Sequence, residues 1–247
     1  MSWNPQQYER FKAERRQPFD DLLALVDRRP NLRVVDLGCG TGELTRELHD
    51  TLGAADTLGV DSSAAMLEKA AAVANASLRF VQAEIEQFAP EQAVDLIFSN
   101  AALHWVDDHE SLFARLATFL ATGGQLAVQM PANEPHASHV TAVETAQELG
   151  IEPRRSPMLP PERYSEILHR LGFTKQHVRL QIYGHLLDSS AGVVEWVKGT
   201  LLTDYERRAG DRWPQFLARY RERLLEKIGD VQPYFFTYRR ILISATR

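Results

Sequence analysis

The sequence predicts an α/β protein with a mainly parallel sheet covered by helices on both faces. The first observation is Leu32–Leu37, an apolar run without alternation, which is typical of a strand buried on both sides. The second is that this run breaks into glycines at 38, 40 and 42 and resumes with helical spacing over Glu43–Leu48. The third is that strand-like and helix-like segments alternate again downstream, as βα units do.

Length and composition limit the possible functions. With 247 residues and 44% hydrophobic residues, the chain can form one large α/β domain with insertions or two small ones, and we expect a single domain over 1–247. A net charge of −5 and a pI near 5.9 disfavour nucleic acid and anionic membranes as partners, so we expect a small molecule. The single cysteine, the lack of a signal-peptide pattern and the lack of a membrane-length apolar run favour a cytoplasmic protein.

The N-terminal segment predicts two helices that precede the first strand. Asn4-Pro5 is typical of an N-cap followed by proline at the first helical position, so we expect a short amphipathic helix over Trp3–Arg16. A second helical pattern follows Pro18, over Phe19–Val26.

The glycine turn after Leu37 is the first candidate site. A side chain at Gly38 or Gly40 would fill volume that a nucleotide-like ligand needs, and the N–H groups of the following helix face the same space. A dinucleotide fingerprint requires a third glycine where this chain has Glu43, which weakens that interpretation. Asp61 ends the next strand, Thr57–Val60, where its carboxylate can accept both hydroxyls of a ribose. The alternative is a tight turn without a ligand, in which Cys39 is a small filler rather than a nucleophile.

The next elements continue the alternation. Ser62-Ser63 can cap a helix over Ala64–Ala74, and strands are expected over Leu78–Gln82 and Ala93–Asn100. Gly123-Gly124 is expected to end the following helix and to start a strand over 125–130. From Pro131 to about Pro161 periodicity is lost and prolines recur, and such a long irregular stretch in a compact domain is usually a functional cover.

The C-terminal part adds helices and a last strand. We expect a helix over Pro161–Leu171, a strand within Phe173–Leu187, helices around Gly192–Leu202 and Trp213–Ile228, and a terminal strand over Tyr234–Ala245. His136 and His139 are spaced like metal ligands, but no third ligand completes a set, so no metal is expected.

The string Asp36-Leu37-Gly38-Cys39-Gly40-Thr41-Gly42, with Asp61 behind it, closely resembles motif I of the class I S-adenosylmethionine-dependent methyltransferases. The resemblance implies a Rossmann-like sheet that binds S-adenosylmethionine and releases S-adenosylhomocysteine. It also implies that an acidic residue after the third strand, Glu84, meets the adenine amino group, and that Ile85 offers its N–H and an apolar face. The implied cofactor-binding residues are Asp36, Gly38, Cys39, Gly40, Asp61, Ser62, Met66, Glu84, Ile85, Asn100 and Ala101.

A wider resemblance is carried by Ser2-Trp3-Asn4-Pro5, Asn100-Ala101-Ala102-Leu103-His104-Trp105, Gln129-Met130-Pro131-Ala132-Asn133 and Trp196-Val197. These strings look like those of the trans-aconitate 2-methyltransferases. That family implies a seven-strand sheet with an antiparallel last strand, N-terminal helices over the cofactor (1–30), and cover insertions over 131–160 and 188–230. It also implies transfer of a methyl group to a carboxylate of trans-aconitate, with His104 and Trp105 beside the transferred group as the catalytic candidates.

Substrate recognition is expected from arginines, because the planar guanidinium binds both oxygens of a carboxylate. The candidate substrate-binding residues are Tyr8, Arg15, Trp196, Arg239 and Arg240. After Trp196-Val197 the family usually continues with Gly-Leu-Arg-Pro, whereas this chain has Leu201-Leu202-Thr203-Asp204, which puts the tricarboxylate in doubt.

Two alternatives remain open at this point. One is a methyltransferase for another small-molecule or carrier-bound acid or hydroxyl, and the other is a protein that binds S-adenosylmethionine without catalysis. Either a monomer or a homodimer is compatible with the sequence.

Overall fold

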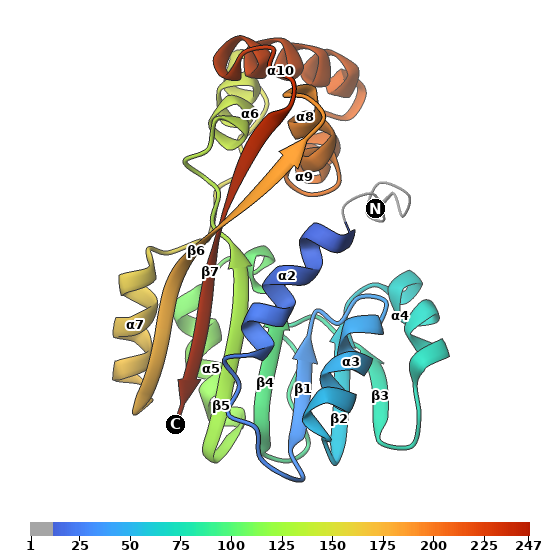
Figure 1. The fold of residues 1–247 in the computed structure, drawn as a ribbon, viewed down its shortest axis with the longest axis vertical. Coiled ribbons are helices and arrows are strands. Elements are labelled where there is room, and N and C mark those ends of the chain that lie inside the picture. Colours follow the sequence, from blue (N-terminus) through green and yellow to red (C-terminus); the bar gives the residue numbers. More distant parts are fainter. Residues whose placement is uncertain (1–11) are drawn as a thin grey trace. The chain divides into compact units, whose positions relative to one another are not determined.

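The computed structural model describes residues 12–247, and the side chains of residues 16–247. The described residues form a seven-stranded sheet in the order β3-β2-β1-β4-β5-β7-β6 (Figure 1). Its strands are β1 (Arg33–Leu37), β2 (Asp56–Asp61), β3 (Leu78–Gln82), β4 (Val94–Asn100), β5 (Leu120–Pro131), β6 (Lys175–Leu187) and β7 (Tyr234–Thr246). The first five strands pair in parallel and β7 is antiparallel to β5, so the predicted α/β fold and its antiparallel last strand are confirmed.

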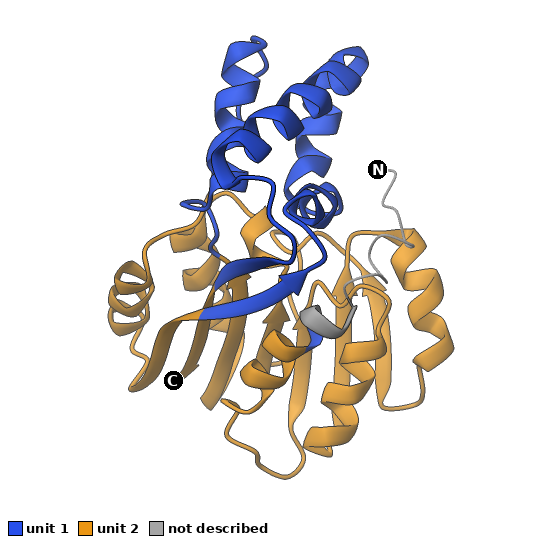
Figure 2. Ribbon diagram, turned by 45° about the horizontal axis from the view of Figure 1, so that its top comes forward, with its two compact units in different colours: residues 1–16, 132–156, 182–239 blue, residues 17–131, 157–181, 240–247 orange. Residues whose placement is uncertain are grey.

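The chain divides into two compact units, which are coloured separately in Figure 2. Unit 2 comprises Gln17–Pro131, Pro157–Gln181 and Arg240–Arg247, and it contains all of β1 to β5. Unit 1 comprises Met1–Arg16, Ala132–Ser156 and Ile182–Arg239, of which the structure describes residues from 12 on. The strands β6 and β7 continue from one unit into the other.

Helices of unit 2 cover both faces of its sheet. Its helices are α2 (Lys12–Leu23, whose first turns belong to unit 1), α3 (Glu43–Leu52), α4 (Ala64–Ala70), α5 (His109–Phe119) and α7 (Pro161–Arg170), with short 3-10 turns η1 (Ala71–Val73) and η2 (Leu103–Trp105). Phe19 of α2 packs edge-on against Phe98 of β4, with ring centroids 5.6 Å apart. Figure 1 shows α5 on the other side of the sheet from α2. Burial of each such ring contributes about 1.5–3 kcal/mol to stability.

Unit 1 is a helical layer on the ends of β6 and β7. Its helices are α6 (Ala137–Glu148), α8 (Ala191–Lys198), α9 (Leu201–Ala209) and α10 (Trp213–Ile228), with a 3-10 turn η3 (Gly210–Arg212). Its core is aromatic: Trp196 packs against Phe236, and Tyr205, Phe216 and Tyr220 stack in sequence. Most of the predicted cover insertions, 131–160 and 188–230, fall in this unit.

Four local expectations were wrong. The helix does not end at Pro18, which lies inside α2. The side chains of the turn after the proline are buried, and their packing against the sheet keeps the chain helical there. The helix before β5 ends at Phe119 rather than at Gly123-Gly124, and these glycines lie within β5. There Val94 pairs with Leu120 but Leu96 pairs with Gln125, so extra residues bulge out of β5.

The third error is the stretch after Pro131, which contains the regular helix α6. Its buried residues are small or hydroxylated: Ser138, Thr141, Ala142, Thr145 and Ala146. The helical period is carried by these small and hydroxylated residues, so the sequence shows no apolar stripe that would indicate a helix. The fourth error is the single helix expected around Gly192–Leu202, which is two helices separated at Gly199 and Thr200. No helix among residues 12–247 is both long and apolar enough to cross a membrane.

Candidate functional site

Apart from Asp36, which lies within β1, the predicted cofactor residues lie at the ends of strands or in the four loops that follow them, at one edge of the sheet of unit 2. Each loop follows a strand, and the four strands are neighbours in the order β3-β2-β1-β4. Because these strands are parallel, their carboxyl ends meet at the same edge, where open α/β sheets bind ligands. The register therefore brings together loops from positions 36 to 105 of the chain.

The glycine turn after β1 is tied to β2. The N–H groups of Gly38 and Cys39 donate to the carbonyl of Val60 at 2.7 and 3.1 Å. Gly38 has a φ of +79°, and a Cβ placed there would lie 2.1 Å from the Cβ of Ala102. Gly40 has a φ of +57°, but a Cβ there would meet no heavy atom within 4 Å. The turn therefore packs against the loop after β4 at Gly38 and leaves open space at Gly40.

Asp61 holds both the glycine turn and the start of α4. Its Oδ2 accepts the N–H of Gly40 and its Oδ1 accepts the N–H of Ser63, each at 2.9 Å. Each carboxylate oxygen has two lone pairs, so capacity remains for two further donors. The side chain is only half-buried. A pair of ribose hydroxyls fits this arrangement, and Gly40 leaves open space beside it.

Asp36 lies inside the unit rather than on its edge. Its side chain is 5% exposed, and its Oδ2 accepts the hydroxyl of Thr45 at 2.6 Å. Burial raises the pKa of the Asp36 carboxyl to about 7, the Thr45 hydrogen bond opposes this rise, and the charge of Asp61 adds to it. Thr45 was not singled out in the sequence, because one threonine on a helix carries no signal.

Cys39 is a packing residue. Its sulfur would lie 3.0 Å from a Cβ placed at Gly59, and its N–H is used by Val60. Burial and the charges of Asp36 and Asp61 raise the pKa of the thiol far above its usual value, so it stays protonated and inert. The cofactor contact predicted for Cys39 therefore has no support from its side chain.

The loop after β2 carries the predicted helix cap. Ser63 is the N-cap of α4, and its hydroxyl accepts the N–H of Met66 at 3.4 Å. Ser62 is exposed, and its carbonyl accepts the Gln82 amide at 2.9 Å. Met66 is half-buried, so part of its side chain is available at this edge.

The loop after β3 is held by an arginine that sequence reasoning missed. Arg115 of α5 donates to the carbonyls of Ile85 and Phe88. The carbonyl of Glu84 accepts the N–H of Phe88 at 2.9 Å, which closes the loop into a turn, and the Glu84 carboxylate is exposed. Half-buried Ile85 thus lies beside an exposed acid, the combination expected around an adenine ring.

The loop after β4 begins with a strained residue. Ala101 has a φ of +58°, which is rare for a residue with a Cβ and is typical of sites held by their surroundings. Its N–H donates to the carbonyl of Gln129 in β5 at 2.9 Å. The Oδ1 of Asn100 is buried and accepts no hydrogen bond from the part of the chain that the structure describes. An acceptor of this kind fits a donor supplied by a ligand.

His104 and Trp105 form the turn η2 of the same loop. Their ring centroids lie 4.8 Å apart, with the planes tilted by 41°. The Trp105 side chain is 49% exposed, whereas Leu103 beside it is fully buried. The loop is therefore anchored by the buried Leu103 and carries the two aromatic rings directly after it.

The two adjacent arginines of β7 cannot serve the same site, because successive side chains of a strand point to opposite faces. Arg240 belongs to unit 2, is 6% exposed, and donates from Nη1 to Oε1 of Gln129 at 3.4 Å. Arg239 belongs to unit 1, where its N–H donates to Oδ1 of Asn133 at 3.1 Å. Of the two, Arg240 shares a unit with the loop after β4, and the register places it on the same face of the sheet as Asn100, the last residue of β4.

The other predicted substrate contacts gain no support. Trp196 is 1% exposed in the core of unit 1, with its ring 4.6 Å from that of His185 and 5.5 Å from that of Phe236. Tyr8 and the side chain of Arg15 lie outside the described residues.

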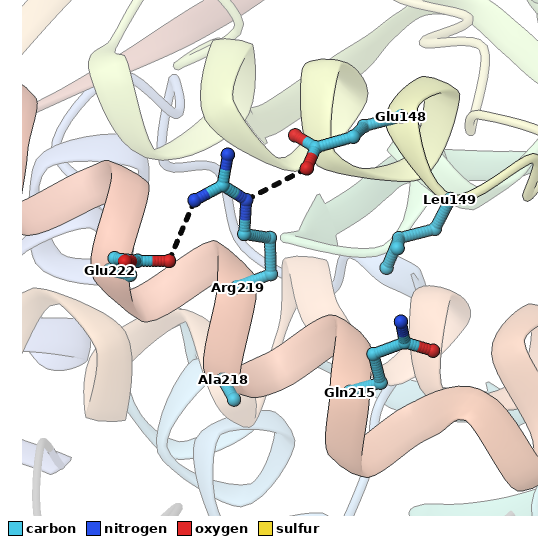
Figure 3. A pocket seen from close by; sticks show the side chains of 6 residues that line it. All are labelled: Glu148, Leu149, Gln215, Ala218, Arg219 and Glu222. Carbon is cyan, nitrogen blue, oxygen red and sulfur yellow. Dashed lines mark hydrogen bonds and ion pairs between the residues drawn. The ribbon is translucent and has the colours of Figure 1, made fainter.

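A surface groove lies elsewhere, in unit 1, between the end of α6 and α10 (Figure 3). Arg219 crosses it and donates to Glu148 at 2.8 Å and to Glu222 at 2.7 Å. Because the groove's arginine is already paired with two carboxylates and no predicted site residue lines the groove, it is not the candidate site.

The two histidines with ligand-like spacing are held by a serine. Ser138 Oγ lies 2.9 Å from Nδ1 of His136 and 3.1 Å from Nδ1 of His139. Burial lowers the pKa of His139 to about 3, with the charges of His136 and Arg154 as smaller causes. Within residues 12–247 no three His, Cys, Asp or Glu side chains form a group that could hold a metal ion.

Comparisons with known proteins agree with this geometry. Residues 34–124 match a family model described as a methyltransferase domain. The chain is 44% identical to the trans-aconitate 2-methyltransferase of Deinococcus radiodurans, over 100% of this chain and 99% of that protein.

Solved structures show the same fold. The YcgJ protein of a Bacillus species matches 94% of this chain and 98% of its own, with a TM-score of 0.64 and 17% identity. The phosphoethanolamine N-methyltransferase 2 of Haemonchus contortus, solved in complex with S-adenosyl-L-methionine, matches 94% of this chain and 52% of its own, with a TM-score of 0.60 and 17% identity. At such identities these two structures support the fold alone. The full-length match to the Deinococcus enzyme goes further: the chain belongs to the trans-aconitate 2-methyltransferase family of S-adenosylmethionine-dependent methyltransferases.

Proposed function

We propose that the protein transfers the methyl group of S-adenosylmethionine to a carboxylate of trans-aconitate, which yields a monomethyl ester and S-adenosylhomocysteine. The observation that carries this proposal is the combination of full-length similarity to a trans-aconitate 2-methyltransferase with an open, acid-flanked glycine turn. The first supports the substrate class and the second supports the proposed cofactor position.

The cofactor would be held by residues of the loops after β1 to β4. Asp61 would accept the ribose hydroxyls, and Glu84 and Ile85 would contact the adenine. Gly40 would leave room for the ligand's backbone, because a side chain there would occupy space that this protein leaves empty. The buried Oδ1 of Asn100 supports a further contact from the loop after β4.

Catalysis requires little acid–base chemistry from the chain. When bound, S-adenosylmethionine supplies a methyl group that its sulfonium has already activated. Carboxylic acids are ionised at neutral pH, so the nucleophile needs no general base. The tasks left to the protein are to position the acceptor carboxylate and to exclude water from it.

Trp105 and Arg240 suit these two tasks. The half-exposed indole of Trp105 supplies an apolar surface that keeps water from the acceptor, and His104 supports it from the side. Arg240 is buried and donates to Gln129, and its planar guanidinium is the kind of group that binds both oxygens of a carboxylate. Both belong to unit 2, as does the predicted cofactor site.

One observation favours a second candidate substrate, a smaller or less charged acid. Where the family usually has an arginine, Thr203 donates its hydroxyl to the carbonyl of Thr200 at 2.6 Å. The next residue, Asp204, is negative and pairs with Arg207 and Arg208. At this position a tricarboxylate therefore has one positive partner fewer than in the family, and neither Thr203 nor Asp204 replaces it.

The partners and location follow from composition. An acidic chain of net charge −5 supports a small-molecule carboxylate rather than nucleic acid as the partner. We further propose a cytoplasmic enzyme that is a monomer or a homodimer, which sedimentation of the purified protein distinguishes.

The test is incubation with methyl-labelled S-adenosylmethionine and a panel of mono-, di- and tricarboxylates. We expect base-labile label, as an ester gives, with trans-aconitate among the substrates. A matched panel of alcohols and amines is the control. Label that resists base, or no transfer to any acid despite binding of S-adenosylhomocysteine, would contradict the proposal.

A further inference from the structure

A buried chain of hydrogen bonds runs from the segment before α7 to the loop after β4. The N–H of Leu159 donates to the Tyr164 oxygen at 3.2 Å, and this oxygen lies 2.5 Å from Nδ1 of His109. Nε2 of the same histidine lies 3.0 Å from the carbonyl of Leu103. His109 is 2% exposed and Tyr164 is fully buried. All of these residues belong to unit 2.

The partners decide which nitrogen of His109 carries the proton. A carbonyl only accepts, so Nε2 must carry a hydrogen and donate to Leu103. In the neutral ring Nδ1 is then an acceptor, and at 2.5 Å it takes the proton of the Tyr164 hydroxyl in preference to the Met158 sulfur, a weak acceptor 3.9 Å away. Burial lowers the pKa of His109, which favours this neutral ring. The hydrogen bonds to the backbone of Leu103 and Val106 oppose this lowering of the pKa, and the charges of Asp108 and Asp107 oppose it less.

The position of His109 is itself fixed by a helix cap. It is the first residue of α5, and Asp108 before it accepts the N–H of Ser111 at 3.0 Å. The ring therefore projects from a rigid helix end toward η2.

The far end of the chain reaches the candidate site. Leu103 is the first residue of η2, so its carbonyl lies one residue before His104 and two before Trp105. Ala102, just before it, is the residue that a Cβ at Gly38 would strike. Holding Leu103 thus holds the loop that carries the aromatic pair and borders the glycine turn. The strained Ala101 at the start of this loop shows that its conformation depends on such outside contacts.

We propose that His109 is a positioning residue for methyl transfer, which fixes the His104-Trp105 loop through the Leu103 carbonyl while Tyr164 selects the required tautomer. The inference rests on the proposed function for its kinetic readout, but its structural half can be tested without substrate.

The first test measures the tautomer directly. Two-bond proton–nitrogen NMR spectra of protein labelled with 15N-histidine should show His109 as neutral with the proton on Nε2, assigned by the peak that the His109→Gln variant lacks. A proton on Nδ1 at neutral pH would overturn the proposal. This result is independent of whether trans-aconitate is the substrate.

The second test uses two amides that mimic different ring nitrogens. The longer side chain of His109→Gln can still donate to Leu103 from the place of Nε2, whereas His109→Asn reaches only the place of Nδ1. We expect kcat to fall at least about tenfold in the Asn variant, because small displacements near the reacting atoms are costly. The Gln variant should stay within about threefold of wild type, and KM and S-adenosylhomocysteine affinity should change less than about threefold in both.

A purely structural role for His109 predicts a different pattern. Both variants would lose thermal stability while the folded enzyme kept its kcat, and equal kcat values in the two variants would overturn the proposal. His49→Gln is the matched control, since His49 is also buried in unit 2 and bonds Thr57 Oγ1 at 2.8 Å, away from η2. It should lower stability and leave kcat unchanged.

Tyr164→Phe keeps the test decisive if the Asn variant does not fold. The change removes the hydroxyl that selects the tautomer, so it should lower kcat when it is made in the wild-type protein. In the His109→Gln variant, which has no tautomer to select, it should not lower kcat further. Equal losses of kcat in the wild-type and His109→Gln backgrounds would overturn the proposal. If wild type itself transfers no methyl group to trans-aconitate, the proposed function fails, and the NMR result alone decides the inference.

Discussion

Asp36 gives the sharpest thermodynamic prediction, because it is a buried acid whose pKa is raised rather than lowered. Raising this pKa from 3.8 to about 7 means that the ionised side chain costs the folded state roughly 4 kcal/mol relative to the unfolded chain. Between these two pH values the folded protein binds more protons than the unfolded one. The stability of the folded protein therefore falls as pH rises through this window, whereas a carboxylate paired with a cation makes stability rise with pH.

The perturbation is Asp36→Asn, which keeps the shape and an oxygen that accepts from Thr45. Urea unfolding of wild type and variant at pH 5 and pH 8 isolates the effect. Relative to wild type, the variant should gain about 2–3 kcal/mol between pH 5 and pH 8. Thr45→Val should move the midpoint of this dependence upward, because it removes the bond that stabilises the anion. A stability difference that does not change with pH would refute the assigned burial of the charge.

The remaining predictions concern ligand binding and can be measured by calorimetry and steady-state kinetics. Asp61→Ala should weaken S-adenosylhomocysteine binding tenfold or more, since charge-assisted hydrogen bonds contribute about 1.5–3 kcal/mol each; unchanged affinity in a folded variant would contradict the assignment. Gly40→Val should abolish cofactor binding with helix content retained by circular dichroism, because the side chain enters open space and the φ of +57° is strained; retained binding would mean that the turn does not face the ligand. Arg115→Met should free the loop after β3, lower stability by about 1–3 kcal/mol and weaken S-adenosylhomocysteine binding; equal affinity would show that the loop orders itself. Arg240→Met should raise KM for the acid substrate with cofactor affinity nearly unchanged, whereas Arg239→Met, on the opposite face, should leave KM unchanged; the reverse pattern would exchange their roles.

The strands were predictable because their signals are local. Leu78–Gln82 is a strand with the predicted bounds, and Asp61 ends β2 as expected. In both cases an apolar run stops at a polar or turn-forming residue, and parallel pairing then fixes where the strand's end lies. The loops after β1 to β4 were therefore placed at one edge from the sequence alone.

Other contacts could not be predicted because they join ordinary residues that are far apart in sequence. Arg115 reaches carbonyls 27 and 30 residues away, and no feature of α5 distinguishes it from a solvated arginine. Thr45 bonds Asp36 only because α3 folds back over β1. Such side-chain to backbone or buried polar bonds depend on the packed structure and leave no periodic pattern.

The substrate side of the site shows where sequence reasoning could have gone further. Trp196 was proposed as a substrate contact on resemblance, although Val193, Val194 and Val197 surround it on the same short helix. These residues form the apolar face of an amphipathic helix whose other side carries Glu195 and Lys198, so the sequence already favoured a core position for this tryptophan. The alternation of a strand likewise excluded equal roles for Arg239 and Arg240. Substrate specificity therefore has to be sought first at Arg240 and at Thr203. The ratio of kcat/KM for trans-aconitate to kcat/KM for a dicarboxylate measures whether the missing family arginine matters. A ratio well above one would show that another cation of this chain replaces it, and a ratio below one would identify Thr203 as a determinant of a smaller acceptor.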